Sequence, residues 1–245
     1  MAGYGEFASV YDLLTENVPY DDIAAYYDSL IHELGAGGSY MLDMGCGTGN
    51  LTFRLAALGY DIVASDASAE MLTIASGKSD GSVQLICQSM TDTELYGAVD
   101  IAVSTLDSIN HLDSAADIQR CFRKTAENMN SGGLFLFDVN TVYKHREVLR
   151  NNTFVYDVDG VYCVWQNEYD PSDDSVAIEL DLFYENDDGS YDRGCESFRE
   201  IALPQERLTQ MLESAGFEVL RIYEYLTTRP PTETSEKLMF AARKK

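Results

Sequence analysis

The sequence is poor in basic residues. Seventeen Lys and Arg stand against 41 Asp and Glu in 245 residues, which gives a formal net charge of −24 at pH 7. The phosphate backbones of nucleic acids and the headgroups of anionic lipids are also negatively charged, so the surface of this chain should repel both. We therefore expect no nucleic acid and no membrane among its partners.

Long apolar runs and paired cysteines are also missing. No uncharged apolar segment is long enough to cross a bilayer, and the N-terminal sequence has no basic region followed by an apolar core. The five cysteines are an odd number without CxxC spacing, in a chain long enough to form a core without disulfides. These absences predict a cytoplasmic protein with reduced thiols.

Histidine is scarce as well. The chain has three, and no two of them have the spacing of metal ligands. His32 and His145 lie in segments that we expect at the surface. No metal site is predicted.

Strand-like and helix-like segments alternate between residues 40 and 140, which predicts an α/β fold with a doubly wound, mostly parallel sheet. Ser68 is the expected N-cap of one helix, and another is expected from Ser114 to Met129. The expected strands cover 40–44, 60–66, 83–89, 99–105 and 132–140.

From about Thr153 the pattern changes to β segments joined by turns, with Asp-Gly pairs at 159–160 and 188–189 that favour hairpins. A helix and two strands then follow up to the last residues. We expect a single domain over 1–245, with an N-terminal helical lid at 1–38 and an inserted antiparallel β meander at 151–202. The aromatic residues of the meander favour packing, and either a monomer or a homodimer is compatible with them.

A glycine-rich loop, LDMGCGTGN at 42–50, lies between the first strand and the next helix. A phosphate-binding P-loop requires Lys and then Ser or Thr after its last glycine, where this chain has Asn50 and Leu51. A dinucleotide fingerprint requires a third glycine, and Asn50 stands at that position. An NAD(P)-dependent oxidoreductase remains an alternative that this spacing weakens.

The acid two places before a GxGxG pattern, Asp43 before Gly45, resembles the first motif of class I S-adenosylmethionine-dependent methyltransferases. Asp66 supports this resemblance, because it ends the second strand at the edge where a carboxylate can accept both ribose hydroxyls. The resemblance implies a seven-stranded sheet of order 3-2-1-4-5-7-6 with strand 7 antiparallel. It also implies S-adenosylmethionine as the cofactor.

Fifteen residues are implied in cofactor binding. Tyr11 belongs to the N-terminal lid, in which an aromatic residue covers the cofactor in small-molecule methyltransferases. Ser89 stands where the family often has an acid that binds the adenine amine, so Ser89, the Met90 backbone or Asp92 would replace it. The full set is Tyr11, Asp43, Met44, Gly45, Cys46, Gly47, Thr48, Gly49, Asp66, Ala67, Met71, Ser89, Met90, Ser104 and Leu106.

The segment after the fourth strand, SINHL at 108–112, resembles the Ser-Gly-His-Leu segment of bacterial amino-sugar N,N-dimethyltransferases, in which the histidine can accept the amine proton. His111 is therefore the candidate general base, since imidazole titrates near neutral pH. Asn110 replaces the family glycine, and together with Asp107 it is expected to orient the acceptor. The meander resembles the elements that cover the acceptor in glycine and amino-sugar N-methyltransferases.

These features predict methyl transfer to the nitrogen or oxygen of a small molecule that carries an amine or a hydroxyl group. A module that binds S-adenosylmethionine without catalysis is the second alternative. It would bind the cofactor tightly and be insensitive to changes at His111.

Overall fold

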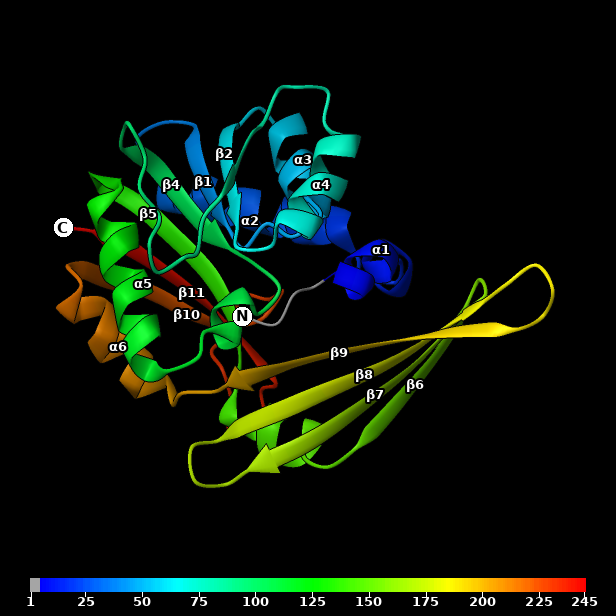
Figure 1. Ribbon diagram of the computed structural model, residues 1–245. Helices are drawn as coiled ribbons and strands as arrows, with labels where there is room; N and C mark the ends of the chain where they lie inside the picture. Colours follow the sequence, from blue (N-terminus) through cyan, green and yellow to red (C-terminus); the bar gives the residue numbers. More distant parts are fainter. Residues whose placement is uncertain (1–4) are drawn as a thin grey trace.

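The computed structural model describes residues 5–245, and its largest element is a seven-stranded sheet of order β10-β11-β5-β4-β1-β2-β3 (Figure 1). With the four strands of the second sheet left out of the count, this is the predicted order 3-2-1-4-5-7-6. The last strand, β11, runs antiparallel to both of its neighbours, as predicted. The strands are β1 (Tyr40–Met44), β2 (Asp61–Asp66), β3 (Gln84–Cys87), β4 (Val99–Ser104), β5 (Met129–Asn140), β10 (Phe217–Glu224) and β11 (Lys237–Lys244).

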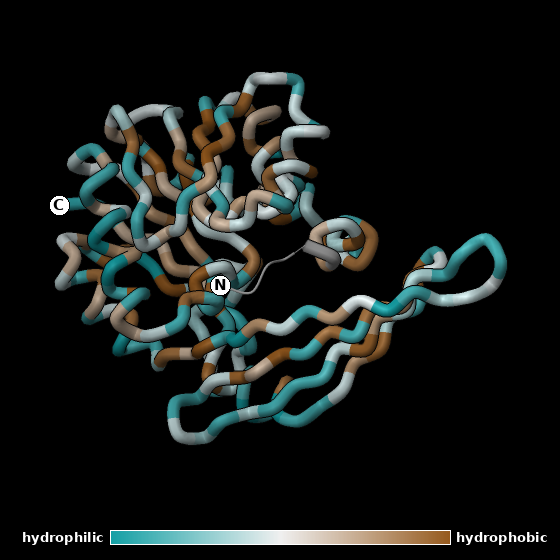
Figure 2. Tube along the Cα trace, in the orientation of Figure 1, coloured by the Kyte–Doolittle hydropathy of each residue, from teal (hydrophilic) through white to brown (hydrophobic). Residues whose placement is uncertain are grey.

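Helices cover both faces of this sheet. On β5, the alternating side chains of Phe135 and Phe137 pack on one face, and those of Leu134 and Leu136 on the other. The first face is covered by α5 (Ala115–Glu127) and α6 (Gln205–Ser214), and the second by α2 (Tyr20–Leu34) and α3 (Asn50–Ala57). Two hydrophobic cores therefore hold the sheet, and the apolar segments lie in the interior of the molecule (Figure 2).

Two helix starts follow the sequence closely. Ser68 caps α4 (Ala69–Lys78), and its hydroxyl accepts a hydrogen bond from the backbone N–H of Met71. Ser114 caps α5 in the same way through the N–H of Asp117. Strand β1 is parallel to both β2 and β4, so the carboxyl ends of these three strands lie at one edge of the sheet. Each is followed by a loop.

A second, four-stranded antiparallel sheet has the order β6-β7-β8-β9 and extends away from the first sheet (Figure 1). Asp159 and Gly160 both have positive φ, as a two-residue turn between β6 and β7 requires. One side of the sheet is apolar, and Val10 of α1 (Gly5–Leu14) packs on it together with Ile178. The strands are β6 (Thr153–Val158), β7 (Val161–Asp170), β8 (Ser175–Glu185) and β9 (Tyr191–Ile201).

Along the chain, a π-helix, η2 (Lys144–Leu149), connects β5 of the first sheet to β6 of the second. This conformation often occurs at functional sites. The expectation that His145 lies at the surface is wrong, because η2 folds beneath the second sheet and leaves His145 with no exposed surface. His32 is exposed, with 74% of its side-chain surface accessible. Among residues 5–245, no helix is long and apolar enough to cross a membrane.

The second sheet should depend on its own apolar core. Ile178 is fully buried there, so Ile178→Ala should lower the free energy of unfolding by about 2–5 kcal/mol through lost contacts and a cavity. Val155 on β6 is 51% exposed, and Val155→Ala should change the same quantity by less than about 0.5 kcal/mol. Urea unfolding of both variants measures the difference, and equal effects would contradict this account of the core.

Candidate active site

The glycine loop is held against the end of β2 by its own backbone. The N–H groups of Gly45 and Cys46 both donate to the carbonyl oxygen of Ser65, at 2.8 and 3.0 Å. Gly45 has φ +73°, and a Cβ there would lie 2.8 Å from the side chain of Ser108. Gly47 has φ +54° and nothing within 4 Å of its Cβ position, so its backbone faces open space in which a ligand could lie.

Asp66 links this loop to the start of α4. One carboxylate oxygen accepts from the N–H of Gly47 and the other from the N–H of Ser68, both at 2.8 Å. Burial raises the pKa of Asp66, and the two backbone hydrogen bonds and the nearby imidazole of His111 offset part of this rise. Each carboxylate oxygen has a second lone pair available, so Asp66 can still accept hydrogen bonds from a ligand.

Asp43 is buried directly beneath the loop. Its Oδ2 accepts from Thr52 Oγ1 at 2.6 Å, whereas Oδ1 has no hydrogen-bond partner among the described residues. Burial raises the pKa of Asp43 to about 6. A carboxylate with an unpartnered oxygen fits a ligand that carries ammonium and sulfonium charges, as S-adenosylmethionine does, and does not fit a pyrophosphate.

The other predicted cofactor residues lie along the same edge of the sheet, but not every side chain faces it. Met44 ends β1 with its side chain in the core beside Thr125, so only its backbone can contribute to the loop. Ser104 is buried and donates to the sulfur of Met90. Thr48 and Met71 are also buried, Cys46, Ser89, Met90 and Leu106 are half-buried, and Ala67 is exposed.

Helix α1 is attached to the glycine loop through Asp12. Its carboxylate accepts from Thr48 Oγ1 at 2.6 Å and from Asn50 Nδ2 at 2.8 Å, and it forms an ion pair with Lys78 at 2.7 Å. Lys78 also donates to Asn50 Oδ1 at 2.9 Å. Tyr11, the neighbouring residue, is half-buried, and burial raises the pKa of its hydroxyl.

After β4 the chain makes a strained turn. Leu106 and Asp107 have φ of +54° and +56°, which non-glycine residues rarely adopt. Their two N–H groups point at one carboxylate, that of Asp138, at 2.8 and 2.9 Å. This turn presents the Asp107 side chain and the short helix η1 (Ser108–His111) to the cleft edge of the sheet.

The charge of Asp107 is balanced by a lysine from β11. Lys237 Nζ lies 2.7 Å from Asp107 and 3.0 Å from Asp138. Burial raises the pKa of Asp107, but Lys237, Lys144 and His111 together hold it well below its usual range. Burial lowers the pKa of Lys237, but the two carboxylates raise it above its ordinary value. Asp107 is thus a carboxylate and Lys237 an ammonium at neutral pH.

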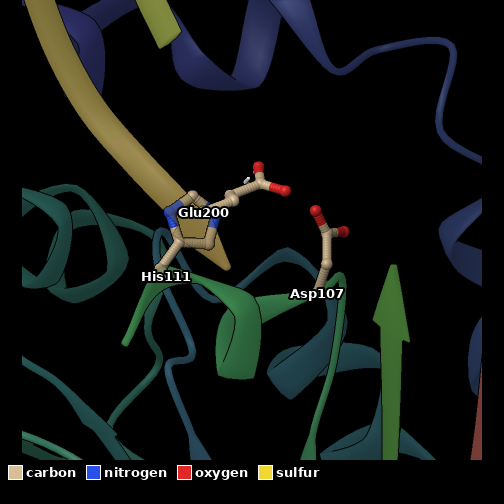
Figure 3. Close-up of side chains that lie close together, drawn as sticks. All are labelled: Asp107, His111 and Glu200. Carbon is tan, nitrogen blue, oxygen red and sulfur yellow. Dashed lines mark ion pairs between the residues drawn. The ribbon is translucent and has the colours of Figure 1, made fainter. Parts of the chain in front are cut away.

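His111 lies at the end of η1 next to Glu200 of β9. Its Nε2 is 3.7 Å from Glu200 Oε1, and its ring centroid is 5.1 Å from that of Phe198 on the same strand. Its side chain keeps 27% of its surface exposed, so a small molecule can reach it. Figure 3 shows the carboxylates of Glu200 and Asp107 pointing toward the same space beside the His111 ring.

Asn110 is placed differently from the side chain expected to orient an acceptor. It is 2% exposed, and its Nδ2 donates to the carbonyl oxygens of Asn140 and Ile201 at 3.1 and 2.9 Å. Its Oδ1 accepts from the N–H of Asn140 at 2.9 Å. Asn110 therefore joins η1 to the ends of β5 and β9, and this bracing could position His111.

Glu200 and Lys237 are not among the predicted site residues, and His145 is expected at the surface from the sequence. Each is separated from His111 by tens of residues, and nothing in the local pattern of the meander marks Glu200 as buried. One signal was available: Glu200 is an acid at the last inward position of the final meander strand, next to the chain's return to the first sheet.

Three side chains at the two ends of η1 and on β9 have atom types that can bind a metal. Asp107, His111 and Glu200 each offer one ligand atom, and these atoms lie within 4.8 Å of one another. Lys237 already pairs with Asp107, and an ammonium at that distance opposes a bound cation. That the protein uses no metal stays a prediction.

Comparison with known proteins identifies the family. Residues 41–133 match a family model described as a methyltransferase domain. A methyltransferase of Geobacillus sp. (strain WCH70) is 33% identical, with 98% of this chain and 99% of the relative aligned. The YqeM methyltransferase of Bacillus subtilis (strain 168) is 32% identical, over 98% of this chain and 97% of the relative.

Solved structures agree with this result. An S-adenosylmethionine-dependent methyltransferase from Clostridium acetobutylicum ATCC 824 superimposes with a TM-score of 0.88 at 28% identity, over 98% of each chain. DesVI of Streptomyces venezuelae shares the fold at 19% identity, with a TM-score of 0.81 over 98% of each chain.

The raised pKa of Asp43 predicts a pH-dependent stability. Its folded-state pKa of about 6 exceeds the ordinary value of 3.8, so the folded state binds a proton more readily than the unfolded state and stability falls as pH rises between these values. Asp43→Asn should remove this loss, which approaches about 3 kcal/mol above pH 6. We expect the unfolding free energy of the variant, relative to wild type, to increase from about pH 4 to pH 7 by an amount of that order.

Urea unfolding at both pH values measures this effect. Asp61→Asn, at the exposed start of β2, is the matched control for a lost carboxylate. If the difference between Asp43→Asn and wild type were the same at both pH values, Asp43 would not carry the burial penalty assigned to it.

Proposed function

The chain belongs to the S-adenosylmethionine-dependent methyltransferases, and from this premise we propose that it methylates a nitrogen or oxygen of a small molecule, with His111 as general base. Membership in a family of methyltransferases favours this activity over an NAD(P)-dependent oxidoreductase and over a module that binds the cofactor without catalysis.

The cofactor would be held by the loop edge of the first sheet. Open backbone at Gly47 gives it a surface to lie on, Asp66 accepts hydrogen bonds from its ribose, and Asp43 places negative charge beneath its cationic end. Bound S-adenosylmethionine supplies an electrophilic methyl group on a sulfonium. Helix α1, fixed to the loop through Asp12, covers this site and limits the access of water.

His111 is the residue that carries the proposal. It is close enough to Asp66 to lower the pKa of that carboxyl, so the candidate base lies near the proposed ribose contact. An acceptor that arrives protonated must lose a proton before its lone pair can attack, and the His111 ring can take that proton. Asp107, on the other side of the shared space, can fix a donor group of the acceptor.

A small acceptor suits the electrostatics. The net charge of −24 repels nucleic acid and attracts cations. It does not repel a neutral molecule. KedS8 of Streptoalloteichus sp. ATCC 53650, a sugar N-methyltransferase that shares the fold at 19% identity, supports the proposal by analogy alone. The second sheet stands beside the cleft and would cover the acceptor.

Cofactor binding tests the role of Asp66. Asp66→Ala removes a charge-assisted ribose contact, so the dissociation constant for S-adenosylhomocysteine should rise by a factor equivalent to about 1.5–3 kcal/mol. Calorimetric titration measures this constant. Asp61→Ala, at the exposed start of the same strand, should leave it unchanged. Equal affinities of Asp66→Ala and wild type would contradict the assignment.

Turnover tests the whole proposal. Purified protein is incubated with S-adenosylmethionine and a panel of small amines and alcohols, and the release of S-adenosylhomocysteine is followed. With an accepted substrate, His111→Gln should lower kcat about 10²–10⁴-fold while the affinity for S-adenosylhomocysteine stays the same. His32→Gln, at an exposed histidine, should behave as wild type.

Two results would overturn the proposal. One is methylation of a protein or nucleic acid in the absence of turnover with any small molecule. The other is full activity of His111→Gln at every pH tested, which would leave alignment alone as the contribution of this segment.

A further inference from the structure

A buried ion pair lies directly behind His111. Glu200 is 2% exposed and is placed between two histidines: Oε1 is 3.7 Å from Nε2 of His111, and Oε2 is 3.3 Å from Nε2 of the fully buried His145. Asn140 Nδ2 also donates to Oε2, at 2.9 Å. The proposed function uses only His111, and it gives no reason for a buried imidazole on the far side of the carboxylate.

The surroundings of His145 determine how many protons its ring carries. Nδ1 lies 2.8 Å from the backbone carbonyl oxygen of Asp174, which can only accept a hydrogen bond, so Nδ1 must be protonated. Nε2 lies 3.3 Å from Oε2 of Glu200 in an ion pair, and it has no hydrogen-bond partner among the described residues. A neutral ring would turn a lone pair toward that oxygen, and a ring with both protons turns an N–H toward it.

Glu200 is the partner that stays ionised. Burial raises its pKa, but the two adjacent histidines, His145 above all, bring it below the ordinary value. Its Oε2 is already engaged by Asn140, which is a donor. Glu200 is therefore the anionic member of the pair.

We propose that Glu200 is a positioning residue for His111, and that His145 is the imidazolium that holds Glu200 in place. This rests on the proposed function in one respect, that His111 acts as the base. His145 and Asn140 fix Oε2, so Oε1 is held toward the His111 ring, which Phe198 contacts from the same strand. When His111 accepts a proton, its new charge lies beside an anion that cannot rotate away.

Other charged groups lie near the His111 ring. Asp107 precedes η1, Asp66 ends β2, and Lys237 of β11 with Lys144 of η2 balance part of the negative charge. Of these, Asp107 is already paired with Lys237. Glu200 differs from them because, among the described residues, its ion pairs are with two histidines, His111 and the buried His145.

The first experiment needs no acceptor. Long-range ¹H–¹⁵N spectra of the histidine rings distinguish an imidazolium from either neutral tautomer, and the chain has only three histidines to assign. In wild type at about pH 8, where an ordinary imidazole is neutral, we expect both ring nitrogens of His145 to be protonated. A His145 ring with one proton at that pH would overturn the proposal without any variant.

The Glu200→Gln variant identifies the cause of this charge. A glutamine amide can donate to Nε2, so His145 should become the neutral ring protonated at Nδ1. Glu179→Gln, at an exposed position of β8, removes a carboxylate of the same type and should leave the His145 spectrum as in wild type. An imidazolium that persists in Glu200→Gln would show that Glu200 does not hold the proton there.

Positioning of His111 is read from the pH profile of methyl transfer. Without the neighbouring anion, His111 should deprotonate more readily, so in Glu200→Gln the acid limb of kcat/KM should move to lower pH by about half a unit or more, with a lower plateau. A lower plateau with no movement of the limb would make Glu200 merely structural. If no small molecule is methylated, the proposed function fails, and the ring spectra still decide the state of His145 and Glu200.

Discussion

One carboxylate, that of Asp138, holds together the parts of the site that come from distant segments. Asp138 is fully buried on β5. It accepts from the N–H groups of Leu106 and Asp107 and from Tyr27 Oη of α2, and it forms an ion pair with Lys237. Two successive non-glycine residues with positive φ are costly, about 1–3 kcal/mol each, and persist only where the surroundings fix them. Asp138 supplies that constraint. The direction of η1, and with it the place of His111, depends on this turn.

The electrostatics of the site follow from the same constraint. Asp138 draws Lys237 inward, and Lys237 then neutralises Asp107, so a protein with a net charge of −24 contains a compact array of buried charges of both signs. Glu200 and His145 form a second buried ion pair. Buried ions are tolerated when their partners are fixed and hydrogen-bonded. Lys237 donates to Asp107 at 2.7 Å, and Asn140 donates to Glu200 at 2.9 Å. Each pair places a carboxylate oxygen within 4.8 Å of a ring nitrogen of His111.

The sequence predicts the features that depend on local pattern and fails at those that depend on contact across the fold. Periodicity and caps predict the strands and helices of the main sheet, and the Asp-Gly pair at 159–160 predicts a hairpin turn, because each depends on neighbouring residues. The strand order is implied by the resemblance to class I methyltransferases. The glycine loop and the end of β2 also meet where expected, since carboxyl ends of parallel strands share an edge. The burial of His145 could not be predicted in this way. It is buried only because a π-helix passes beneath a sheet whose carbonyl and carboxylate groups are supplied 29 and more residues later.

Asn50 shows how a departure from a motif becomes intelligible in three dimensions. In sequence it occupies the place of a third glycine and argues against a dinucleotide. In the structure its side-chain amide donates to Asp12 and accepts from Lys78, so it connects the glycine loop to α1 and to α4. A glycine at this position could make neither bond. Val10 of α1 packs on the second sheet, so the glycine loop and the second sheet are joined through one short helix. The two sheets are therefore not independent, and the residue that weakens one motif helps to couple them.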